Sequence, residues 1–457
     1  MDASQKAGKL FLTLDETVDR LKNIAGRSQI QKIKLALPED SKLYLVGGVV
    51  RDVISQIDTE DIDLTTNLEA QDVARFLEAA NIRVVPTGLQ HGTVMAVIDE
   101  KHFEITTFRA GKKENRGSII EDLSERDFTI NAIAYCLDEH KLVDPFNGFN
   151  DLQSAKLKCV NNPTDRFNED PLRILRAIRF GTAAGRDIDK ITAEVIPNFA
   201  QHLKTVAIER IQKEISKILL SDFAAEAIRD LHKYNLLEII FPELIPTIGF
   251  EQNKFHNQDV FEHSLSVLSA CPKDLMLRLA AIYHDIGKVY TLSVDQQGSR
   301  HFYDHEKISA QITQESMERL KFSKEQIDTV TCIVKLHMRP LDCGPSGTRR
   351  ILRDSGQHYD RWRQFKNADR PVVFDDDLLE QLKVRFDQMV QAEYDRQIGS
   401  VYSKLAISGD DLIALGMKPG KQMGALLSEL KEMVIEDPEY NDREKLLEIA
   451  TKRIQSQ

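Results

Sequence analysis

The sequence predicts an α+β protein in which a mixed α/β part comes first and a long helical part follows. Apolar runs of strand length lie at 43–46, 94–98 and 105–108. A stretch with helical spacing at 69–80 separates the first two runs, and this mixture of strands and helices indicates an α/β domain. From Glu169 onward the apolar residues keep a helical period, for example at 207–220 and 275–283. Residues 297–303 interrupt this period, which predicts a small non-helical insertion.

Length and composition are those of an ordinary globular chain. At roughly 150 residues per domain, the 457 residues predict about three domains. The formal net charge of −11 excludes a globally basic nucleic-acid binder, although it allows a local basic surface. The five cysteines form no C-x-x-C pair, which argues against a zinc ribbon or a disulfide framework. Because no membrane-length apolar run and no signal-like N-terminus occur, we expect a soluble cytoplasmic protein without membrane contact.

A glycine turn follows the first predicted strand, in the segment LVGGVVRD at 45–52. Gly47 and Gly48 would let the backbone approach a phosphate with its amide hydrogens exposed. Arg51 lies where it could add a charge-assisted hydrogen bond. A plain strand-to-helix connection is the alternative interpretation of this turn.

Asp61 and Asp63 form a D-x-D pair nine residues beyond Asp52. On a strand, residues i and i+2 point to the same side, so the two carboxylates repel each other unless a cation lies between them. Such oxygen ligands suit Mg²⁺, and two such ions can activate an attacking hydroxyl and steady a leaving pyrophosphate. A surface pair without a metal is the alternative. Glu104 is either a third acidic residue near the metals or a solvent-facing carboxylate.

The glycine turn followed by the D-x-D pair resembles the first motif of the class II tRNA nucleotidyltransferases, the family that includes CCA-adding enzymes and bacterial poly(A) polymerases. Further segments resemble family segments, at 102–109, 125–135, 144–152, 168–180 and 408–424. The resemblance covers nearly the whole chain and is closest at 43–220. It implies a tRNA acceptor arm as partner, CTP and ATP as substrates, and two catalytic Mg²⁺ ions at Asp61 and Asp63.

The resemblance also implies a domain order, in which a polymerase-β-like nucleotidyltransferase head precedes an all-α neck, body and tail. We expect an N-terminal helical extension (1–35), the head (36–165), a nucleotide-selecting neck (166–235), an HD-type helical body (236–375) and a tRNA-binding tail (376–457). Asp170 and Pro171 predict the start of a neck helix, with proline at its first helical position.

Asp170 and Arg173 could select a base without a template strand. Asp170 accepts a hydrogen bond and Arg173 donates one, which matches the amino group and ring nitrogen of cytosine or adenine and opposes the order in uracil and guanine. A wrong base would leave buried polar groups unpaired. The matching family residues act in this way, with Glu169 as a supporting neighbour. A plain helix cap at Asp170 and solvated arginines are the alternative.

Other residues of these motifs are candidates for nucleotide binding. Arg176 and Arg179 recur at three-residue spacing along the predicted neck helix. By the resemblance, Arg126 and Asp127 contact the incoming ribose. Position 125 departs from the family, which often has arginine where this chain has Glu125, so the role of that side chain stays open.

The stretch between Arg109 and Glu121 has only eleven residues, 110–120. In CCA-adding relatives it is longer and carries a flexible loop that helps to reshape the pocket from C to A. The short form resembles CC-adding members, which leave the final A to a separate A-adding enzyme. We therefore expect CC addition from CTP, with complete CCA addition as the alternative. A poly(A) polymerase is a further alternative, which the form GGVVRD disfavours.

A second set of residues, in the predicted body, resembles the HD phosphohydrolase domain. Its members follow the order of that domain: His263, His284, Asp285, His305 and Asp369. The resemblance implies that His263, His284, Asp285 and Asp369 hold a divalent metal. Hydrolysis is a separate question, because some members keep only the helical scaffold. Two alternative hypotheses place the whole chain in another functional class. One is an HD phosphohydrolase with a nucleotide-sensing head, and the other is an RNA-binding scaffold without catalytic activity.

Two basic segments are candidate contacts for tRNA phosphates. The first, 348–366, contains Arg349, Arg350, Arg353, Arg361, Arg363 and Lys366 together with Tyr359 and Trp362. The second is KPGKQMG at 418–424. Ordinary solvated helices are the alternative for both. Since an enzyme of this kind acts on every tRNA, we expect that it does not recognise the bases of the tRNA. Binding through phosphates should depend steeply on salt concentration.

Overall fold

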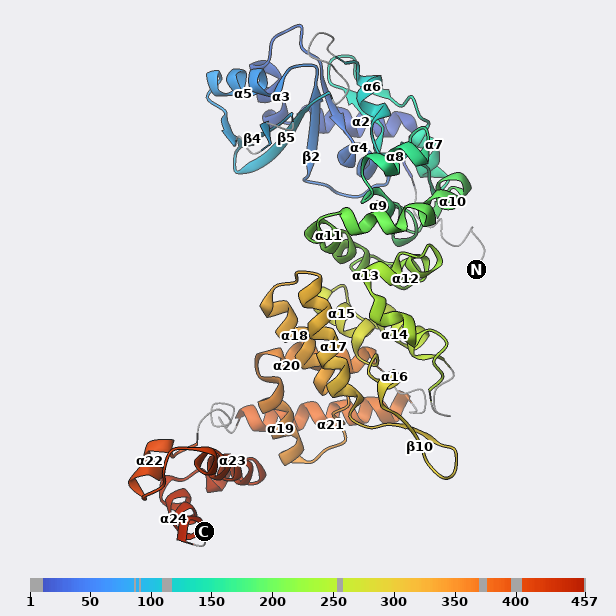
Figure 1. The fold of residues 1–457 in the computed structure, drawn as a ribbon. Coiled ribbons are helices and arrows are strands. Elements are labelled where there is room, and N and C mark those ends of the chain that lie inside the picture. The colour runs from blue at the N-terminus through green and yellow to red at the C-terminus, as the bar shows by residue number, and fades with distance from the viewer. Residues whose placement is uncertain are drawn as a thin grey trace. The chain divides into compact units, whose positions relative to one another are not determined.

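The computed structural model describes residues 11–85, 88–89, 92–108, 117–252, 258–369, 376–395 and 405–455. The chain forms two compact units, Met1–Ile240 and Phe241–Gln457 (Figure 1). The first contains a large sheet with helices, and the second is almost entirely helical, which confirms the predicted α+β class. Among the helices of the described residues, none combines the length and the apolar character that a membrane crossing requires.

A seven-stranded mixed sheet organises the first part of the first unit. Its strands are β1 (Leu43–Val46), β2 (Ile62–Thr66), β3 (Arg83–Val85), β4 (Thr93–Ile98), β5 (Lys101–Thr107), β6 (Ala134–Cys136) and β7 (Lys141–Val143). Their spatial order is β3-β4-β5-β2-β1-β6-β7, and β2 pairs with β5 in parallel while the other neighbours are antiparallel. The predicted strands at 43–46 and 94–98 are confirmed. Residues 105–107 of the third run form the end of a longer strand, β5, and Phe108 directly follows it.

Helices pack against this sheet and complete its core. They are α2 (Leu14–Ala25), α3 (Ser28–Ala36), α4 (Gly48–Ile54), α5 (Ala70–Ala79), α6 (Ile119–Ser124) and α7 (Gly148–Gln153), with the short 3₁₀ helix η2 (Thr129–Asn131). One apolar cluster joins Tyr44 and Val46 of β1 to Ala134 of β6 and Leu123 of α6. All four residues of β1 are buried. Both faces of this strand are covered by other parts of the protein, so each of its positions favours an apolar side chain. This explains the continuous apolar run LYLV.

The remainder of the first unit is helical apart from one pair of short strands. These strands are β8 (Lys156–Leu157) and β9 (Asp187–Ile188), and they pair in parallel. The helices are α8 (Pro163–Glu169), α9 (Arg173–Phe180), η3 (Thr182–Ala184), α10 (Lys190–Phe199), η4 (Ala200–Thr205), α11 (Ile208–Leu219), α12 (Ala224–Lys233) and α13 (Leu237–Ile240). Strand β9 is a small exception to the helical period predicted beyond Glu169.

The predicted helix start at Asp170 and Pro171 is wrong by two residues. Asp170 lies at the C-terminal cap of α8, and α9 begins at Arg173. The Asp170 carboxylate accepts a hydrogen bond from the backbone N–H of Leu172 at 3.2 Å. Asp170 therefore stabilises a turn between two helices. Such turns and helix caps favour the same residue types, which explains the wrong prediction.

In the residues that the structure describes, the second unit consists of packed helices and one hairpin. Its helices are η5 (Pro242–Thr247), α14 (Val260–Ala270), α15 (Leu275–Tyr283), α16 (Lys288–Thr291), α17 (His305–Arg319), α18 (Lys324–Leu336), α19 (Pro345–Ser355), η6 (Gly356–His358), α20 (Tyr359–Ala368), α21 (Asp376–Asp395), α22 (Gly409–Ala414), α23 (Lys421–Glu436), η8 (Pro438–Tyr440) and α24 (Arg443–Gln455). The antiparallel strands β10 (Leu292–Val294) and β11 (Arg300–Phe302) form the hairpin. The predicted non-helical insertion at 297–303 is confirmed as its turn and second strand.

Arg349 is packed inside the second unit rather than presented to solvent. It is 4% exposed, and its guanidinium donates to Glu393 Oε1 at 2.9 Å. It also donates to the backbone carbonyls of Ile435 and Glu436, each at 2.6 Å. Because α23 ends at Glu436, this cation satisfies carbonyl groups that a helix end leaves without partners.

The other basic residues of 348–366 also have partners within the protein. The ion pairs and hydrogen bonds join Arg350 and Arg353 to Glu432, Arg361 to Asp274, Arg363 to Asp387, and Lys366 to the carbonyl of His337. Trp362 is fully buried. The prediction that this segment contacts tRNA phosphates is therefore wrong for its buried members, and the charges of the remaining arginines face carboxylates of the same chain.

Replacing Arg349 with alanine should destabilise the second unit strongly. The change removes the guanidinium opposite buried Glu393, and breaking such a buried pair costs about 3–5 kcal/mol. We expect a loss of that order in the free energy of unfolding, measured by urea denaturation of the full chain. Arg350→Ala removes a partly exposed pair and should cost less than about 1 kcal/mol. Equal losses in the two variants would contradict this role for Arg349.

Candidate functional site

Three carboxylates share one face of the main sheet. Asp63 lies on β2 and is paired in register with Glu104 on β5, and Asp61 immediately precedes β2. Burial raises the pKa of Asp63 to about 6, with further contributions from the charges of Asp61 and Glu104. Arg126 and Arg51 oppose this increase. An all-oxygen set of crowded carboxylates fits hard divalent cations such as Mg²⁺, which would relieve the repulsion.

The glycine turn lies directly beside these carboxylates. Gly47 has a φ of +69° and precedes α4, a conformation that favours glycine. A Cβ atom added to Gly47 would lie only 2.9 Å from Arg126 Nη1. A Cβ atom added to Gly48 would lie 3.9 Å from both Asp63 Oδ2 and Arg51 Nη2. The structure therefore brings the predicted phosphate turn, both arginines and the D-x-D pair to one place.

Arg51 is held in position by neighbours from three elements. Its Nε donates to Asp52 Oδ1 at 2.9 Å and its Nη1 to Asn131 Oδ1 at 2.8 Å. Its guanidinium carbon lies 4.9 Å from the ring centroid of Phe180, at the end of α9. Arg126 is held similarly by Asp122, at 3.0 Å. These contacts fix the guanidinium groups of Arg51 and Arg126 near Asp63 before any nucleotide binds.

Asp127 is buried, and both of its carboxylate oxygens have donors. Oδ1 accepts from the N–H of Phe128 at 2.9 Å and from Asn131 Nδ2 at 3.0 Å, and Oδ2 accepts from Arg176 at 2.7 Å. Burial acts to raise the pKa of Asp127, but Arg176 and the hydrogen bonds outweigh burial and hold the pKa below its usual value. Asp127 thus fastens the segment after α6 to α9, and its expected ribose contact stays a prediction.

Two of the three neck arginines share partners, because Arg176 and Arg179 both lie near Glu214 and over the ring of Phe180. Arg176 pairs with Asp127, while Arg179 donates to Glu214 of α11 at 2.5 Å and lies 3.8 Å from the centroid of the Phe180 ring. Arg173 points instead toward α8 and the segment after α6. The even spacing in the sequence therefore brings Arg176 and Arg179 together but leaves Arg173 apart from them. Nucleotide contacts by Arg176 and Arg179 stay predictions.

The predicted base-reading pair is oriented by bonds on both members. Arg210 of α11 donates to Asp170 Oδ2 at 2.7 Å. Arg173 donates to Glu169 Oε2 at 2.6 Å and to the backbone carbonyl of Glu125 at 3.1 Å. Sequence reasoning missed Arg210, because spacing alone does not show that the first turn of the amphipathic helix α11 lies beside the pair.

The contact at Glu125 explains why the side chain at this position can differ from that of relatives. Arg173 touches only the main-chain carbonyl of residue 125. A main-chain acceptor is present whichever side chain the position carries. The departure from arginine therefore leaves this contact with Arg173 intact.

The predicted short loop at 110–120 lies mostly outside the described residues, which resume at 117. Ser118 caps α6 and Glu121 completes a capping box with it. The second predicted tRNA contact, 418–424, is described, and it has Lys418 and Lys421 exposed where α23 begins. Phosphate contact by these lysines stays a prediction.

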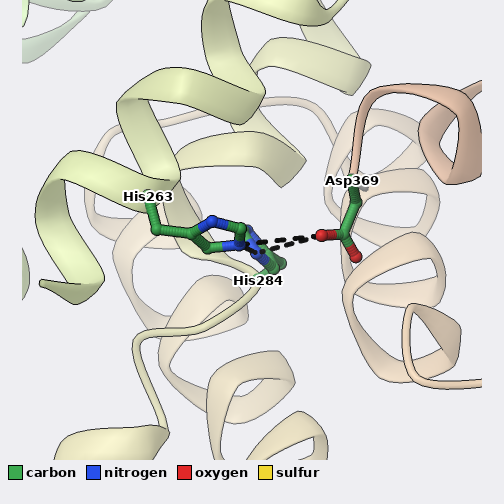
Figure 2. A group of neighbouring side chains, drawn as sticks. All are labelled: His263, His284 and Asp369. Atoms are coloured by element: carbon green, nitrogen blue, oxygen red, sulfur yellow. Dashed lines mark hydrogen bonds and ion pairs between the residues drawn. The ribbon is translucent and has the colours of Figure 1, made fainter. Parts of the chain in front are cut away.

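The predicted metal-binding residues of the second unit come together from separate helices. His263 lies on α14, His284 and Asp285 directly follow α15, and Asp369 directly follows α20. In Figure 2 the rings of His263 and His284 face the Asp369 carboxylate, with distances from Nε2 to Oδ1 of 3.7 and 3.9 Å. Asp285 Oδ2 lies 3.5 Å from His263 Nε2 and 3.2 Å from His284 Nε2.

Sequence reasoning missed one member of this group, His337. Its Nε2 lies 3.2 Å from His305 Nε2 and 3.4 Å from Asp285 Oδ1. His337 and His284 each follow the last residue of an apolar helix, α18 and α15. That shared position was the available signal, although a histidine at a helix end usually serves as a cap.

Family models match the chain in three stretches. Residues 43–158 match the "Poly A polymerase head domain", residues 186–247 the "Probable RNA and SrmB-binding site of polymerase A", and residues 299–450 "tRNA nucleotidyltransferase domain 2". The first stretch contains the glycine turn and the crowded carboxylates.

Several curated proteins and solved structures are similar over nearly the full length. The A-adding tRNA nucleotidyltransferase of Deinococcus radiodurans is 30% identical, with 85% of this chain and 90% of that protein covered. The CCA-adding enzyme of Anoxybacillus flavithermus is also 30% identical, with 93% and 96% covered. The structure of the Bacillus stearothermophilus CCA-adding enzyme in complex with CTP superposes with a TM-score of 0.68 at 22% identity, covering 96% of this chain and 98% of that one.

The raised pKa of Asp63 predicts that this residue lowers the stability of the metal-free protein while it contributes to metal binding. Because the folded pKa of Asp63 is raised from 3.8 to about 6, the group costs stability progressively as the pH rises between these two values, and the full cost is present above about 6. Asp63→Asn should therefore raise the melting temperature of the metal-free protein at pH 8, by roughly 2–4 °C for each kcal/mol recovered. Mg²⁺ should raise the melting temperature of the parent protein but not of this variant.

The matched control is Asp58→Asn, at an exposed carboxylate that precedes β2. It should leave both the metal-free melting temperature and the response to Mg²⁺ unchanged. A lower melting temperature of metal-free Asp63→Asn would contradict the proposed crowding of carboxylates.

Proposed function

Because this chain belongs to the class II tRNA nucleotidyltransferases, a family of CTP/ATP:tRNA nucleotidyltransferases, we propose that it adds CC from CTP to the 3′ end of tRNA and releases pyrophosphate. The observation that carries this proposal is the pair Asp170 and Arg173, fixed by Arg210 and by the carbonyl of Glu125. The acceptor is the tRNA acceptor arm, held in part by Lys418 and Lys421, and the expected location is the cytoplasm.

Asp61 and Asp63 would hold two Mg²⁺ ions, with Glu104 as their acidic neighbour. When bound, such ions activate the attacking 3′ hydroxyl and steady the leaving pyrophosphate. Arg51 would bind the triphosphate beside the backbone of the glycine turn, a role supported by its fixed orientation. Arg126 lies against the same turn and would contact the ribose.

The base would be chosen by hydrogen-bond direction. The ionised Asp170 carboxylate accepts from the amino group of cytosine, and Arg173 donates to the adjacent ring nitrogen. Glu169 holds Arg173 at 2.6 Å and Arg210 holds Asp170 at 2.7 Å, so neither group has to be ordered when the nucleotide arrives. Uracil would place an acceptor against Asp170 and a donor against Arg173, which leaves both interactions unmade.

The restriction to CC rests on the short stretch of eleven residues at 110–120. A pocket that accepts two bases of different size needs a segment that can move, and this stretch is short for that purpose. A separate A-adding enzyme would then complete the tRNA. Complete CCA addition by this chain is the alternative, supported by relatives that are named CCA-adding enzymes.

We also propose that His263, His284, Asp285 and Asp369 hold a divalent cation in the second unit. The convergence of these side chains from α14, α15 and α20 supports this site. The crowded carboxylates of β2 and β5 belong to the first unit, so this cation would be separate from the two Mg²⁺ ions proposed for nucleotidyl transfer.

The product should end in CC when both nucleotides are supplied. A tRNA transcript lacking CCA is incubated with CTP, with ATP, and with both, and the 3′ ends are sequenced. We expect CC in the first and third reactions and no addition in the second. Efficient terminal A in the third reaction would overturn the restriction to CC. A second transcript that ends in CC is incubated with ATP, and addition of A to it without any addition of CC to the first transcript would indicate an A-adding enzyme.

Asp170→Asn should shift base selection toward uracil. The amide offers a donor to the uracil carbonyl where the carboxylate accepts from cytosine, so the ratio of kcat/KM for CTP over UTP should fall roughly tenfold or more, equivalent to about 1.4 kcal/mol. The control is Asp165→Asn, an exposed carboxylate on the neighbouring helix α8, which should keep the parent ratio. An unchanged ratio in Asp170→Asn would exclude base reading by this residue.

A further inference from the structure

Four arginines gather around Phe180, the last residue of α9. The guanidinium carbons of Arg51, Arg176 and Arg179 lie 4.9, 5.2 and 3.8 Å from the centroid of its ring. The fourth, Arg186, directly precedes β9 and donates from Nη1 to the backbone carbonyl oxygen of Phe180 at 3.0 Å. Guanidinium groups interact favourably with an aromatic ring, but four cations in one place also repel one another.

Arg186 differs from the other three in its lack of a counter-charge. The others each have a carboxylate within hydrogen-bond distance, in the pairs Arg51–Asp52, Arg176–Asp127 and Arg179–Glu214. Among the residues that the structure describes, no carboxylate lies within ion-pair distance of Arg186, and its five N–H donors make one hydrogen bond. The group of four therefore carries an excess of positive charge next to the proposed triphosphate site.

The environment of Arg186 makes this excess charge costly. The side chain is only partly exposed to solvent. Burial and the positive charge of Arg51 lower the pKa of Arg186 to about 10, and the opposing effect of Asp52 does not compensate them. The guanidinium is still charged at neutral pH, so it loses hydration without gaining a counter-charge. An anion bound beside it would remove this cost.

The neighbours of Arg186 indicate which anion this is. Arg51 acts on the pKa of both Asp63 and Arg186, whereas Arg186 is not among the main charges that act on Asp63. Arg51 is therefore placed between the crowded carboxylates and Arg186. The reacting α-phosphate has to lie at the cations proposed for Asp63. The β- and γ-phosphates would then extend past the glycine turn to Arg51, and their free end would reach Arg186.

We propose that Arg186 binds the terminal phosphate of the incoming nucleotide, together with Arg51, and then the pyrophosphate that leaves. This proposal rests on the proposed function and deepens it, because it adopts the triphosphate site assigned to Arg51. The planar guanidinium can donate to two phosphate oxygens at once. Since the contact does not involve the base, it should contribute equally to the binding of every nucleoside triphosphate.

The charge that develops during transfer also favours this contact. The 3′ oxygen forms a bond to the α-phosphorus and loses its proton to solvent. The bond between that phosphorus and the oxygen bridging to the β-phosphate breaks, and its electron pair stays on the pyrophosphate. The leaving group therefore gains negative charge, and a guanidinium already held at its far end would stabilise that charge.

A helix cap is the competing explanation for Arg186. The carbonyl that accepts its hydrogen bond belongs to the last residue of α9, where a cation interacts favourably with the helix dipole. This role needs one donor and no ligand. It predicts that a substitution lowers stability without any preference among phosphate compounds.

The test measures the binding of CTP, CMP and inorganic pyrophosphate to the full chain in the presence of Mg²⁺. Arg186→Gln removes the positive charge. The Kd values for CTP and for pyrophosphate should rise roughly tenfold, because a charge-assisted contact is lost, while the Kd for CMP stays unchanged. Arg186→Lys should recover most of the affinity for CTP. The control Lys190→Gln removes a cation that is 87% exposed on the next helix, α10, and should leave all three Kd values unchanged.

Three other results would overturn the proposal. Equal losses for CTP and CMP would indicate damage to the whole pocket. Unchanged binding of all three probes with a lowered melting temperature would indicate a helix cap only. A raised KM for tRNA with an unchanged Kd for CTP would assign Arg186 to the tRNA backbone. Failure of the proposed function is distinguishable from these results, because the parent protein would then incorporate no CTP into tRNA.

A measurement on the parent protein covers the case of a variant that does not fold. Phenylglyoxal modifies accessible arginines, and mass spectrometry of peptides locates the modified residues. We expect saturating pyrophosphate with Mg²⁺ to protect Arg186 from modification and CMP to leave it unprotected. Equal modification of Arg186 with and without pyrophosphate would contradict the proposed contact.

Discussion

The parallel pairing of β2 with β5 is the constraint on which the candidate site depends. It sets Asp63 opposite Glu104 in register and so gathers acidic groups that repel one another. The glycine turn after β1 then has to pass close to that carboxylate, and Gly47 and Gly48 leave no side chain in the way. Arg51 and Arg126 compensate part of the negative charge. Electrostatic cost in the metal-free protein is thus concentrated where the proposed catalytic cations would bind.

Three ion pairs in the neck join residues that are distant in the sequence. Asp127 meets Arg176, Glu214 meets Arg179, and Asp170 meets Arg210. The first two pairs are largely buried, so their formation is coupled to correct packing of α9 and α11. The third is about half exposed on its arginine and contributes mainly orientation. The proposed base-reading pair is accordingly preorganised rather than strongly stabilised.

The sequence supported the prediction of local features better than of partners. Strand β1 could be predicted because four consecutive apolar residues produce a local signal, and α15 because of its helical period. The burial of Arg349 could not, because its acceptors lie 44 to 87 residues away and its own neighbours are basic. His337 and Arg210 were missed for the same reason, since each acquires its place only when helices pack. The helix start at Asp170 failed because a turn and a helix cap use the same residue types.

Helix α9 carries Arg173 at its first residue and Phe180 at its last, and the ring of Phe180 lies beneath the guanidinium of Arg51. This helix therefore connects the group proposed to select the base with a side chain that supports the group proposed to hold the triphosphate. A base that fits poorly and displaces Arg173 would disturb the start of α9 and, through Phe180, one of the contacts that orient Arg51. Through such a linkage a wrong nucleotide would be transferred slowly as well as bound weakly. Fidelity would then depend on the rate of transfer and not only on affinity.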